Sequence, residues 1–450
     1  MRRCAVVLTA VLTLVPLPAA AQPAAADRDP RIAALLTSIS ETRLEQLLRT
    51  LVGFGTRNTM SDTSSPTRGI GAARQWILDE LTRTSPRLQV SFDAHRLKKG
   101  AGNGRIIRNV ELRNVIAVLP GRSPRRIYVS GHYDSLNLGK EGQIGFNREG
   151  ATAPPPPASL DPNVDAPGAN DDGSGTVLVM ELARVFAESG IDFDATLVFM
   201  AVAGEEQGLL GARAHARAMR AARVPVPVQG IFNNDIVGGA VGGTGTDAET
   251  IRLYSEGPDD SPSRALAMFT ARLAQRYVPG HTVRLLARRD RFSRGGDHTA
   301  WNLEGFAAVG FRESRENYAR QHGPGDTIEG VSFSYLARNA RVNAAAMAEL
   351  ALAPPPPSIG NARGVPMLDR RPSGYDARLR WNPSPGATGY RVVWRDAWTA
   401  DWQHDAVVGN VTEWVLPKAN IDDFVYGVAA IGPGGHESPV TAYVPPPPNY

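Results

Sequence analysis

Ile127-Tyr128-Val129-Ser130-Gly131-His132-Tyr133-Asp134 is the part of the sequence from which the fold can be predicted most directly. Its first five residues form a short, mostly apolar run, which predicts a strand buried on both faces of a sheet. Two ionisable side chains, His132 and Asp134, follow this run directly, although such side chains are uncommon in a hydrophobic core. The stretch therefore predicts an α/β sheet whose strands end in chemically active residues.

Four further polar clusters lie in comparable places along the chain. Two of them, Gly204-Glu205-Glu206 and Asn233-Asn234-Asp235, follow apolar runs, and residues 168–175 (GANDDGSG) lead into a helix pattern. The last is 321–327 (QHGPGDT). Each alone is typical of a turn, a cap or a helix start. Together, at the carboxyl ends of strands, two histidines and several carboxylates predict a metal site of nitrogen and oxygen ligands, which suits zinc.

Amphipathic helix patterns alternate with the apolar runs. Strand patterns occur at 110–119, 126–131, 195–203, 228–235 and 305–311. Helix patterns occur at 31–51, 69–84, 175–188, 208–222, 262–277 and 336–352. Short apolar strands between such helices predict an α/β sheet covered on both faces.

The composition changes after the proline run 354–357, which predicts a stiff spacer. Residues beyond it carry aromatic and β-branched side chains in short alternating runs separated by turn signals, which predicts a small antiparallel β-sandwich. His404 and His436, in this part, are expected at the surface. The proline run 154–157 predicts a surface loop within an insertion, 136–167. The predicted segments are a signal peptide (1–21), an α/β domain (27–353), a linker (354–363), the sandwich (364–444) and a tail (445–450).

The N-terminus has the pattern of a secretory signal peptide. Arg2 and Arg3 precede the apolar run 5–17, and small residues at 19–21 form a cleavage site before Gln22. We therefore expect an exported protein, periplasmic or extracellular. The single cysteine, Cys4, would leave with the peptide, so the mature chain could form no disulfide.

Composition excludes several classes of protein. Apolar residues make up 42% of the 450 residues and charged residues 21%, which argues against wholesale disorder. The net charge of +4 is small and spread along the chain, so it indicates neither nucleic acid nor an anionic membrane as a partner. No internal stretch reaches the roughly 18 uninterrupted apolar residues of a membrane span. The sequence does not indicate the oligomeric state.

Taken in order, the motifs resemble those of the co-catalytic di-zinc exopeptidases, which include bacterial leucyl aminopeptidase and the glutamate carboxypeptidases. The set comprises His-x-Asp, Gly-Ala-x-Asp-x-x-Ser-Gly, Glu-Glu-x-Gly-Leu-Leu-Gly, Asn-x-Asp and a late His-x-x-x-Asp-Thr. The likeness covers about 44–352, which makes 27–353 a di-zinc peptidase domain. It implies a three-layer α/β/α fold with a mixed central sheet. The C-terminal segment resembles, on weaker signals, a fibronectin type III module with an immunoglobulin-like sandwich.

The resemblance assigns a role to each cluster. Two zinc ions would be bound by the metal ligands His132, Asp171, Glu206, Asp235 and His322, with Asp171 bridging them. Asp134 would orient the His132 imidazole, and Glu205 would be the general base that activates a metal-bridging hydroxide. Asp326 would either orient His322 or cap a turn.

Some positions depart from the family pattern. Some members place a tyrosine where this chain has Gln321, and others place one where it has Ser293. Tyr318 is a candidate replacement, with a structural role as the alternative. Asp297 and His298 either bind substrate or form hydrogen bonds at a helix start.

The resemblance predicts an exported zinc exopeptidase that acts on peptides or proteins, and it favours an aminopeptidase. A carboxypeptidase of the same fold is the first alternative, because an arginine commonly binds a C-terminal carboxylate. The candidates for that task are Arg288, Arg289, Arg291, Arg294 and Arg312. The first four are expected on a solvated loop, and Arg312 is expected to pair with Glu313 or Glu316. A non-catalytic binding or adhesion protein on the same fold is the second alternative.

Overall fold

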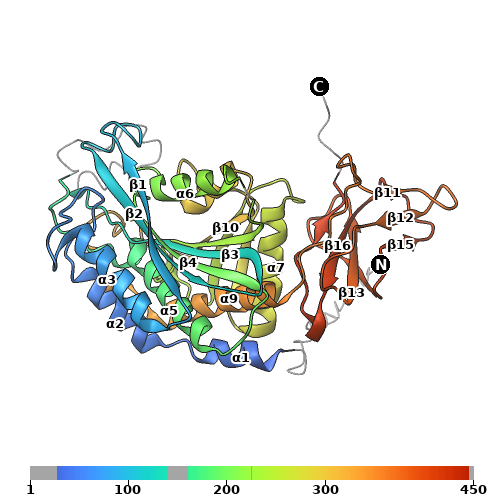
Figure 1. The fold of residues 1–450 in the computed structure, drawn as a ribbon, viewed down its shortest axis with the longest axis horizontal. Helices are drawn as coiled ribbons and strands as arrows, with labels where there is room; N and C mark the ends of the chain where they lie inside the picture. The colour runs from blue at the N-terminus through green and yellow to red at the C-terminus, as the bar shows by residue number, and fades with distance from the viewer. Residues whose placement is uncertain (1–27, 140–160, 224, 445–450) are drawn as a thin grey trace, which may run out of the picture.

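The computed structural model describes residues 28–139, 161–223 and 225–444. An eight-stranded mixed sheet forms its main part, with the strand order β1-β2-β4-β3-β5-β10-β8-β9 (Figure 1). The strands are β1 (Gln89–Leu97), β2 (Val110–Leu119), β3 (Ser123–His132), β4 (Ala195–Val202), β5 (Val228–Asn234), β8 (Thr250–Ser255), β9 (Thr282–Leu286) and β10 (Ala308–Glu313). The four central strands, β4-β3-β5-β10, are parallel, and β2 and β8 run antiparallel to them on either side.

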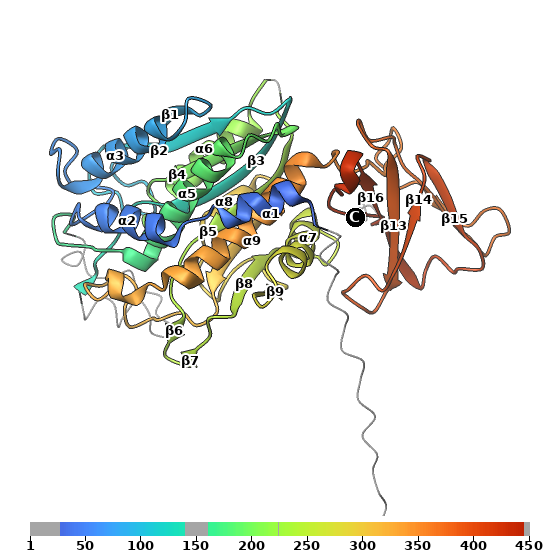
Figure 2. The same ribbon diagram turned by 90° about the horizontal axis from the view of Figure 1, so that it is seen from below.

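Helices cover both faces of this sheet, so the predicted three-layer α/β/α class is confirmed (Figures 1 and 2). One face packs against α1 (Pro30–Thr37), α2 (Glu41–Val52), α3 (Gly69–Thr84), α5 (Ser174–Glu188), α7 (Pro262–Tyr277) and α9 (Phe333–Leu352). The other packs against α6 (Leu210–Arg220) and α8 (Asp297–Leu303).

The central strand β4 shows why its sequence is a continuous apolar run. Leu197, Phe199 and Ala201 are buried under the larger helix layer. The alternate residues Val198, Met200 and Val202 are buried under α6 and α8. Because successive side chains of a strand point to opposite faces, a sheet covered on both sides leaves no place for polar alternation.

Some elements differ from the prediction. The pattern over 31–51 predicted one helix, but the chain forms α1 and α2, because the Ser40 side chain accepts the Arg43 N–H and caps a new helix start. Strands β1, β8 and β9 were not predicted. The signal peptide, the tail and most of the insertion 136–167, with the proline run 154–157, lie outside the described residues.

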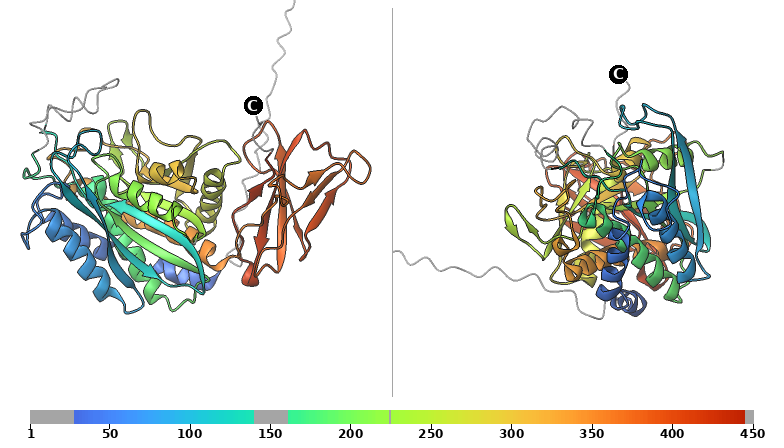
Figure 3. Two further views of the ribbon diagram at one scale, coloured as in Figure 1. Left: turned by 45° about the horizontal axis from the view of Figure 1, so that its top comes forward. Right: turned by 90° about the vertical axis from the view of Figure 1, so that its left-hand side faces the viewer.

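The C-terminal part forms two further antiparallel sheets (Figure 3). One holds β11 (Leu368–Asp369), β12 (Ala377–Arg380) and β15 (Glu413–Leu416); the other holds β14 (His404–Val408), β13 (Gly389–Asp396), β16 (Phe424–Ile431) and β17 (Thr441–Ala442). Aromatic and aliphatic side chains from both sheets, among them Trp381, Tyr390 and Tyr426, form a single core. The all-β class is confirmed, whereas the likeness to fibronectin type III stays a prediction.

His436 does not lie at the surface, so this part of the prediction is wrong. The side chain is 3% exposed and lies at the joint between the two parts of the chain. Its Nδ1 is 3.0 Å from Glu349 Oε2 on α9, and its Nε2 is 3.1 Å from Asp29 Oδ2 before α1. A local sequence pattern cannot show these two partners, because both are far from His436 in the sequence. His404 is exposed, as expected.

Within the described residues, no helix has both the length and the apolar character needed to cross a membrane.

Candidate metal centre and active site

The central parallel strands bring the predicted clusters to one edge of the sheet. Strand β3 ends at His132, β5 ends one residue before Asp235, and β4 ends shortly before Glu205. Because these strands are parallel neighbours, their carboxyl ends meet. The short segment Ala169–Gly173, which leads into α5, adds Asp171 to the same edge.

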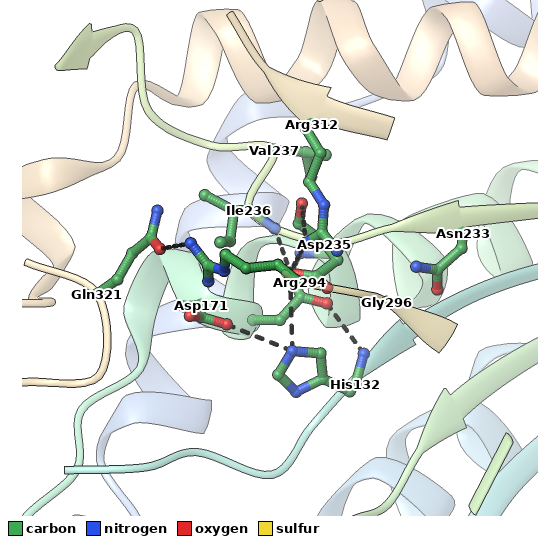
Figure 4. Close-up of polar contacts among 12 residues, drawn as sticks. His132, Asp171, Asn233, Asp235, Ile236, Val237, Arg294, Gly296, Arg312 and Gln321 are labelled. Carbon is green, nitrogen blue, oxygen red and sulfur yellow. Dashed lines mark hydrogen bonds and ion pairs between the residues drawn. The ribbon is translucent and has the colours of Figure 1, made fainter. Parts of the chain in front are cut away.

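Asp171 lies between the two histidines, and each histidine faces a different carboxylate oxygen. His132 Nε2 is 3.3 Å from Asp171 Oδ1, and Figure 4 shows the two side chains facing each other. His322 Nε2 is 3.1 Å from Asp171 Oδ2. A carboxylate placed in this way can share its oxygens between two cations.

Two further carboxylates complete the groups around the histidines. Asp235 Oδ1 is 3.8 Å from His132 Nε2, and Glu206 Oε2 is 3.2 Å from His322 Nε2. The structure thus brings all five predicted ligands together. It places Asp172 close to His132 as well. Both Asp172 oxygens, however, accept backbone N–H groups, from His132, Gly175 and Ile236, so Asp172 holds the loops while Asp171 faces the histidines.

The residues of this cluster fit zinc. Glu206 Oε1 is buried and accepts no hydrogen bond from any described residue. Buried carboxylate oxygens are rarely left in this state without an ion or water as partner. Imidazole nitrogens and carboxylate oxygens are ligands that zinc takes readily.

Asp134 connects the two halves of the cluster. Its Oδ1 accepts the Glu205 N–H at 3.1 Å, and its Oδ2 accepts the Glu206 N–H at 3.2 Å. His132 Nδ1 lies 3.1 Å from the Asp134 backbone oxygen and 3.6 Å from Oδ1. Asp134 therefore orients the imidazole mainly through its backbone, and it fixes the Glu205-Glu206 turn through its carboxylate.

The electrostatics reflect a concentration of buried charge. Burial raises the pKa of Glu205 well above its usual range, and Asp235 and Glu206 add to this rise while His132 opposes it. Burial alone would lower the pKa of His322, but Glu206 and Asp171 outweigh it and raise the pKa to about 10. The carboxylates thus draw positive charge to the site, and divalent cations would supply it.

Asp326 supports the loop that carries Asp171. Its carboxylate accepts the backbone N–H groups of Asn170 at 3.0 Å and Asp171 at 2.8 Å. Of the two predicted roles for Asp326, the structure shows backbone capping. The buried Arg57 holds the same loop from the other side, because its guanidinium donates to Tyr133 O at 2.6 Å and to Gly168 O at 2.8 Å.

Arg312 does not pair with Glu313 or Glu316, so that expectation is wrong. Its guanidinium forms an ion pair with the Asp235 carboxylate (Figure 4) and lies 3.5 Å from Asp290 Oδ2. Burial raises the pKa of Asp235, but Arg312 outweighs it and holds the pKa well below its usual range. Chain neighbours are poor guides here because consecutive residues of β10 point to opposite faces of the sheet.

The basic loop that carries Arg288, Arg289, Arg291 and Arg294 differs from the expectation, because it is not simply solvated. Arg291 Nη1 is 2.6 Å from Glu316 Oε2, and both side chains are buried. Arg294 Nη1 donates to Gln321 Oε1 at 2.8 Å (Figure 4). Arg289 pairs with Glu256 at 3.1 Å.

A cavity of about 350 Å³ opens on the cluster. Glu205, Glu206, Asp171, Asp235 and His322 line one side of it. The loop residues Arg291, Ser293 and Arg294, which had been singled out in the sequence, also line the cavity. The remaining side chains of the wall had not been singled out and are Arg105, Leu209, Arg213 and Thr299. No local motif marks Arg105, Leu209, Arg213 or Thr299, because they come from separate segments that only the fold brings together.

None of the three predicted substrate-binding residues lines this cavity. Asp297 is 1% exposed, and burial, with Asp134 and Asp235 adding and His132 opposing, raises its pKa to about 7. His298 is buried against Gly310, and its Nε2 is 2.8 Å from Arg289 O. Tyr318 is about half exposed, with its ring centroid 5.9 Å from the Arg294 guanidinium carbon.

Similar proteins share this architecture. A family model described as peptidase family M28 matches residues 114–347. A probable zinc metalloprotease of Pyricularia oryzae is 37% identical over 93% of this chain and 85% of its own length. Among solved structures, the LapA aminopeptidase of Legionella pneumophila superposes with a TM-score of 0.52 at 20% identity, over 75% of this chain and 78% of that one. An aminopeptidase from Aneurinibacillus sp. strain AM-1 gives 0.50 at 15% identity, over 70% and 95%.

Proposed function

The chain belongs to peptidase family M28 and is a zinc metallopeptidase, and from this premise we propose that it is an exported aminopeptidase with two zinc ions. The observation that carries the proposal is Asp171 between His132 and His322, with one oxygen toward each. His132, Asp171 and Asp235 would hold one ion, and Asp171, Glu206 and His322 the other. Bound zinc would polarise the scissile carbonyl and lower the pKa of a water molecule at the site.

Glu205 is the general base in this proposal. It lines the cavity, and Asp134 fixes its backbone N–H, so its carboxylate is held beside the ligands. The raised pKa of the Glu205 carboxyl, caused first by burial, suits a group that must accept a proton near neutral pH. Glu205 takes a proton from the attacking water and passes it to the amine that leaves.

The charge around the cavity supports cleavage at the amino end of a peptide. A free α-ammonium group needs carboxylates near the scissile bond, and the cavity offers Glu205 and those of the metal cluster. Of the five arginines that could have favoured a carboxypeptidase, four form ion pairs with carboxylates: Arg291 and Arg294 with Glu316, Arg312 with Asp235 and Arg289 with Glu256. Both solved structures described above are of aminopeptidases.

One peptide in two blocked forms tests the direction of cleavage. N-acetylation should stop cleavage, because it removes the α-ammonium, and C-terminal amidation should leave it unchanged. Analysis of the released products by mass spectrometry gives the cleaved end directly. Cleavage of the acetylated peptide with loss of cleavage of the amidated one would assign a carboxypeptidase instead.

Export is proposed from the sequence of residues 1–21. Its test is N-terminal sequencing of the protein recovered outside the cytoplasm. The mature chain is expected to begin at Gln22, and an intact Met1 on the recovered protein would contradict export by cleavage.

A further inference from the structure

Two arginines in the wall of the cavity have no carboxylate partner among the described residues. Among the residues that the structure describes, the Arg105 guanidinium donates only to the backbone oxygen of Glu206, at 3.1 Å. Arg213, near the start of α6, is exposed, and its side chain makes no ion pair or hydrogen bond with a described residue. Both therefore keep donors available to a ligand in the cavity.

The other basic residues around the site differ from these two. Glu316 forms ion pairs with Arg252 and Arg291. Arg312 pairs with Asp235 and lies near Asp290. Within the described residues, carboxylates thus pair with Arg252, Arg291 and Arg312, but not with the two arginines that face the cavity from the side of Glu205 and Glu206.

The remaining surface of the cavity argues against a large apolar side chain as ligand. Among the described residues that line it, Leu209 is the only one with an aliphatic side chain of any size. Gly208, Ser293 and Thr299 leave room without offering apolar surface. A volume of about 350 Å³ is at the small end of the range for small-molecule sites. One or two residues of a peptide would fill it.

We propose that Arg105 and Arg213 bind a carboxylate of the substrate, and that the enzyme prefers peptides whose N-terminal residue is Asp or Glu. The inference rests on the proposed aminopeptidase function. Arg105 contacts the backbone of Glu206, and Arg213 lies on the helix that follows it, so the carboxylate belongs to a residue next to the scissile bond. An arginine fork matches a carboxylate with two parallel hydrogen bonds, which a neutral amide cannot accept equally well.

The test compares Glu-Ala-Ala-amide with Gln-Ala-Ala-amide, two peptides that differ in charge but scarcely in shape. The wild-type enzyme should show a kcat/KM for the glutamyl peptide about 10–100-fold higher, the range expected for hydrogen bonds to a charged group. Arg213→Gln should reduce this ratio by about tenfold, chiefly through a higher KM for the glutamyl peptide. Arg105→Gln should act in the same direction.

Arg217→Gln is the matched control. Arg217 lies one turn further along α6, is exposed, pairs with Glu304 at 3.3 Å and does not line the cavity. Its substitution should leave the ratio unchanged. Free glutamate should also inhibit the wild-type enzyme more strongly than free glutamine, and Arg213→Gln should remove the difference. This readout does not depend on turnover of the charged peptide.

A second pair, Gln-Ala with a free C-terminus and its amide, distinguishes the other source of a carboxylate. A preference for the free form that Arg213→Gln removes, without a glutamyl preference, would overturn the assignment to the N-terminal side chain. Equal rates on all four peptides would overturn the inference entirely. Failure of the aminopeptidase proposal would be detected separately, by cleavage of an N-acetylated peptide, so it cannot be mistaken for either of these results.

Discussion

The carboxyl end of the peptidase sheet and the core of the C-terminal sandwich bury opposite kinds of side chain. The first buries carboxylates, imidazoles and a guanidinium, among them Asp134, Asp171 and Arg312. The second buries rings and aliphatic side chains, such as Trp381 and Tyr390. The ion pair between Arg370 and Asp422 of the sandwich, by contrast, is exposed.

This difference shows where stability depends on a ligand. Buried charge is costly unless it is paired or binds a metal. Within the described ranges, every group of side chains that could hold a metal lies at the carboxyl end of the peptidase sheet. The members of these groups come from the part of the sequence from His132 to His322. The sandwich has a complete apolar core of its own. We therefore expect metal to matter for the first region and not for the second.

Removal of zinc should have the largest effect. Dialysis against a strong chelator should abolish peptide hydrolysis, and added zinc should restore it. The loss should also lower the unfolding temperature of the peptidase part, because a ligand at about 1,000 times its Kd stabilises the state that binds it by about 4 kcal/mol. Calorimetry should show no shift for the sandwich. Full activity in metal-free protein would contradict the account.

Glu205→Gln should come next in size. The amide keeps the shape of the side chain but cannot accept a proton, so kcat should fall by about 10²–10⁴-fold. The metal content should remain that of the wild type. Glu304→Gln, at the end of α8, is the control and should be fully active. Near-wild-type turnover of Glu205→Gln would refute the assignment, and lost zinc would make Glu205 a ligand.

Asp326→Asn should have an intermediate effect. One oxygen remains to accept a backbone N–H of the Asp171 loop, but the charge is lost. Partners that orient metal ligands typically account for about 10–100-fold in metal affinity or activity, and we expect a loss in that range. Competition with a fluorescent zinc chelator measures the affinity. The control Asp422→Asn, on the sandwich, should leave the zinc affinity unchanged. An unchanged zinc affinity in Asp326→Asn would show that the Asp171 loop keeps its conformation without the Asp326 charge.

His436→Ala, at the joint, should have the smallest effect on catalysis. It leaves the buried Glu349 without one partner, which should cost about 1–3 kcal/mol of stability. The kcat should not change, because the joint is remote from the metal cluster in the sheet. His404→Ala, on the exposed face of the same sandwich, is the control. A fall in kcat without a fall in stability would show that the two regions are coupled.

The sequence was most informative where chain order and spatial order agree. The apolar strands and the polar clusters at their ends, such as His132 and Glu205-Glu206, could be predicted because each strand carries its own residues to the shared edge. The pairing of Arg312, the burial of His436 and the cavity arginines could not. These depend on contacts between distant segments, and exposed or partly exposed strands such as β1 and β9 lack the continuous apolar run of β4.

The central claim is that Asp171 joins two zinc sites in one catalytic centre. Its most direct test is a zinc titration of the metal-free enzyme, with metal content and hydrolysis measured at each step, for the wild type and for Asp171→Asn. The account predicts that wild-type activity is complete at two zinc ions per chain, and that Asp171→Asn binds zinc poorly at both sites and is inactive. Full activity at one zinc ion per chain, or an active Asp171→Asn enzyme, would contradict it.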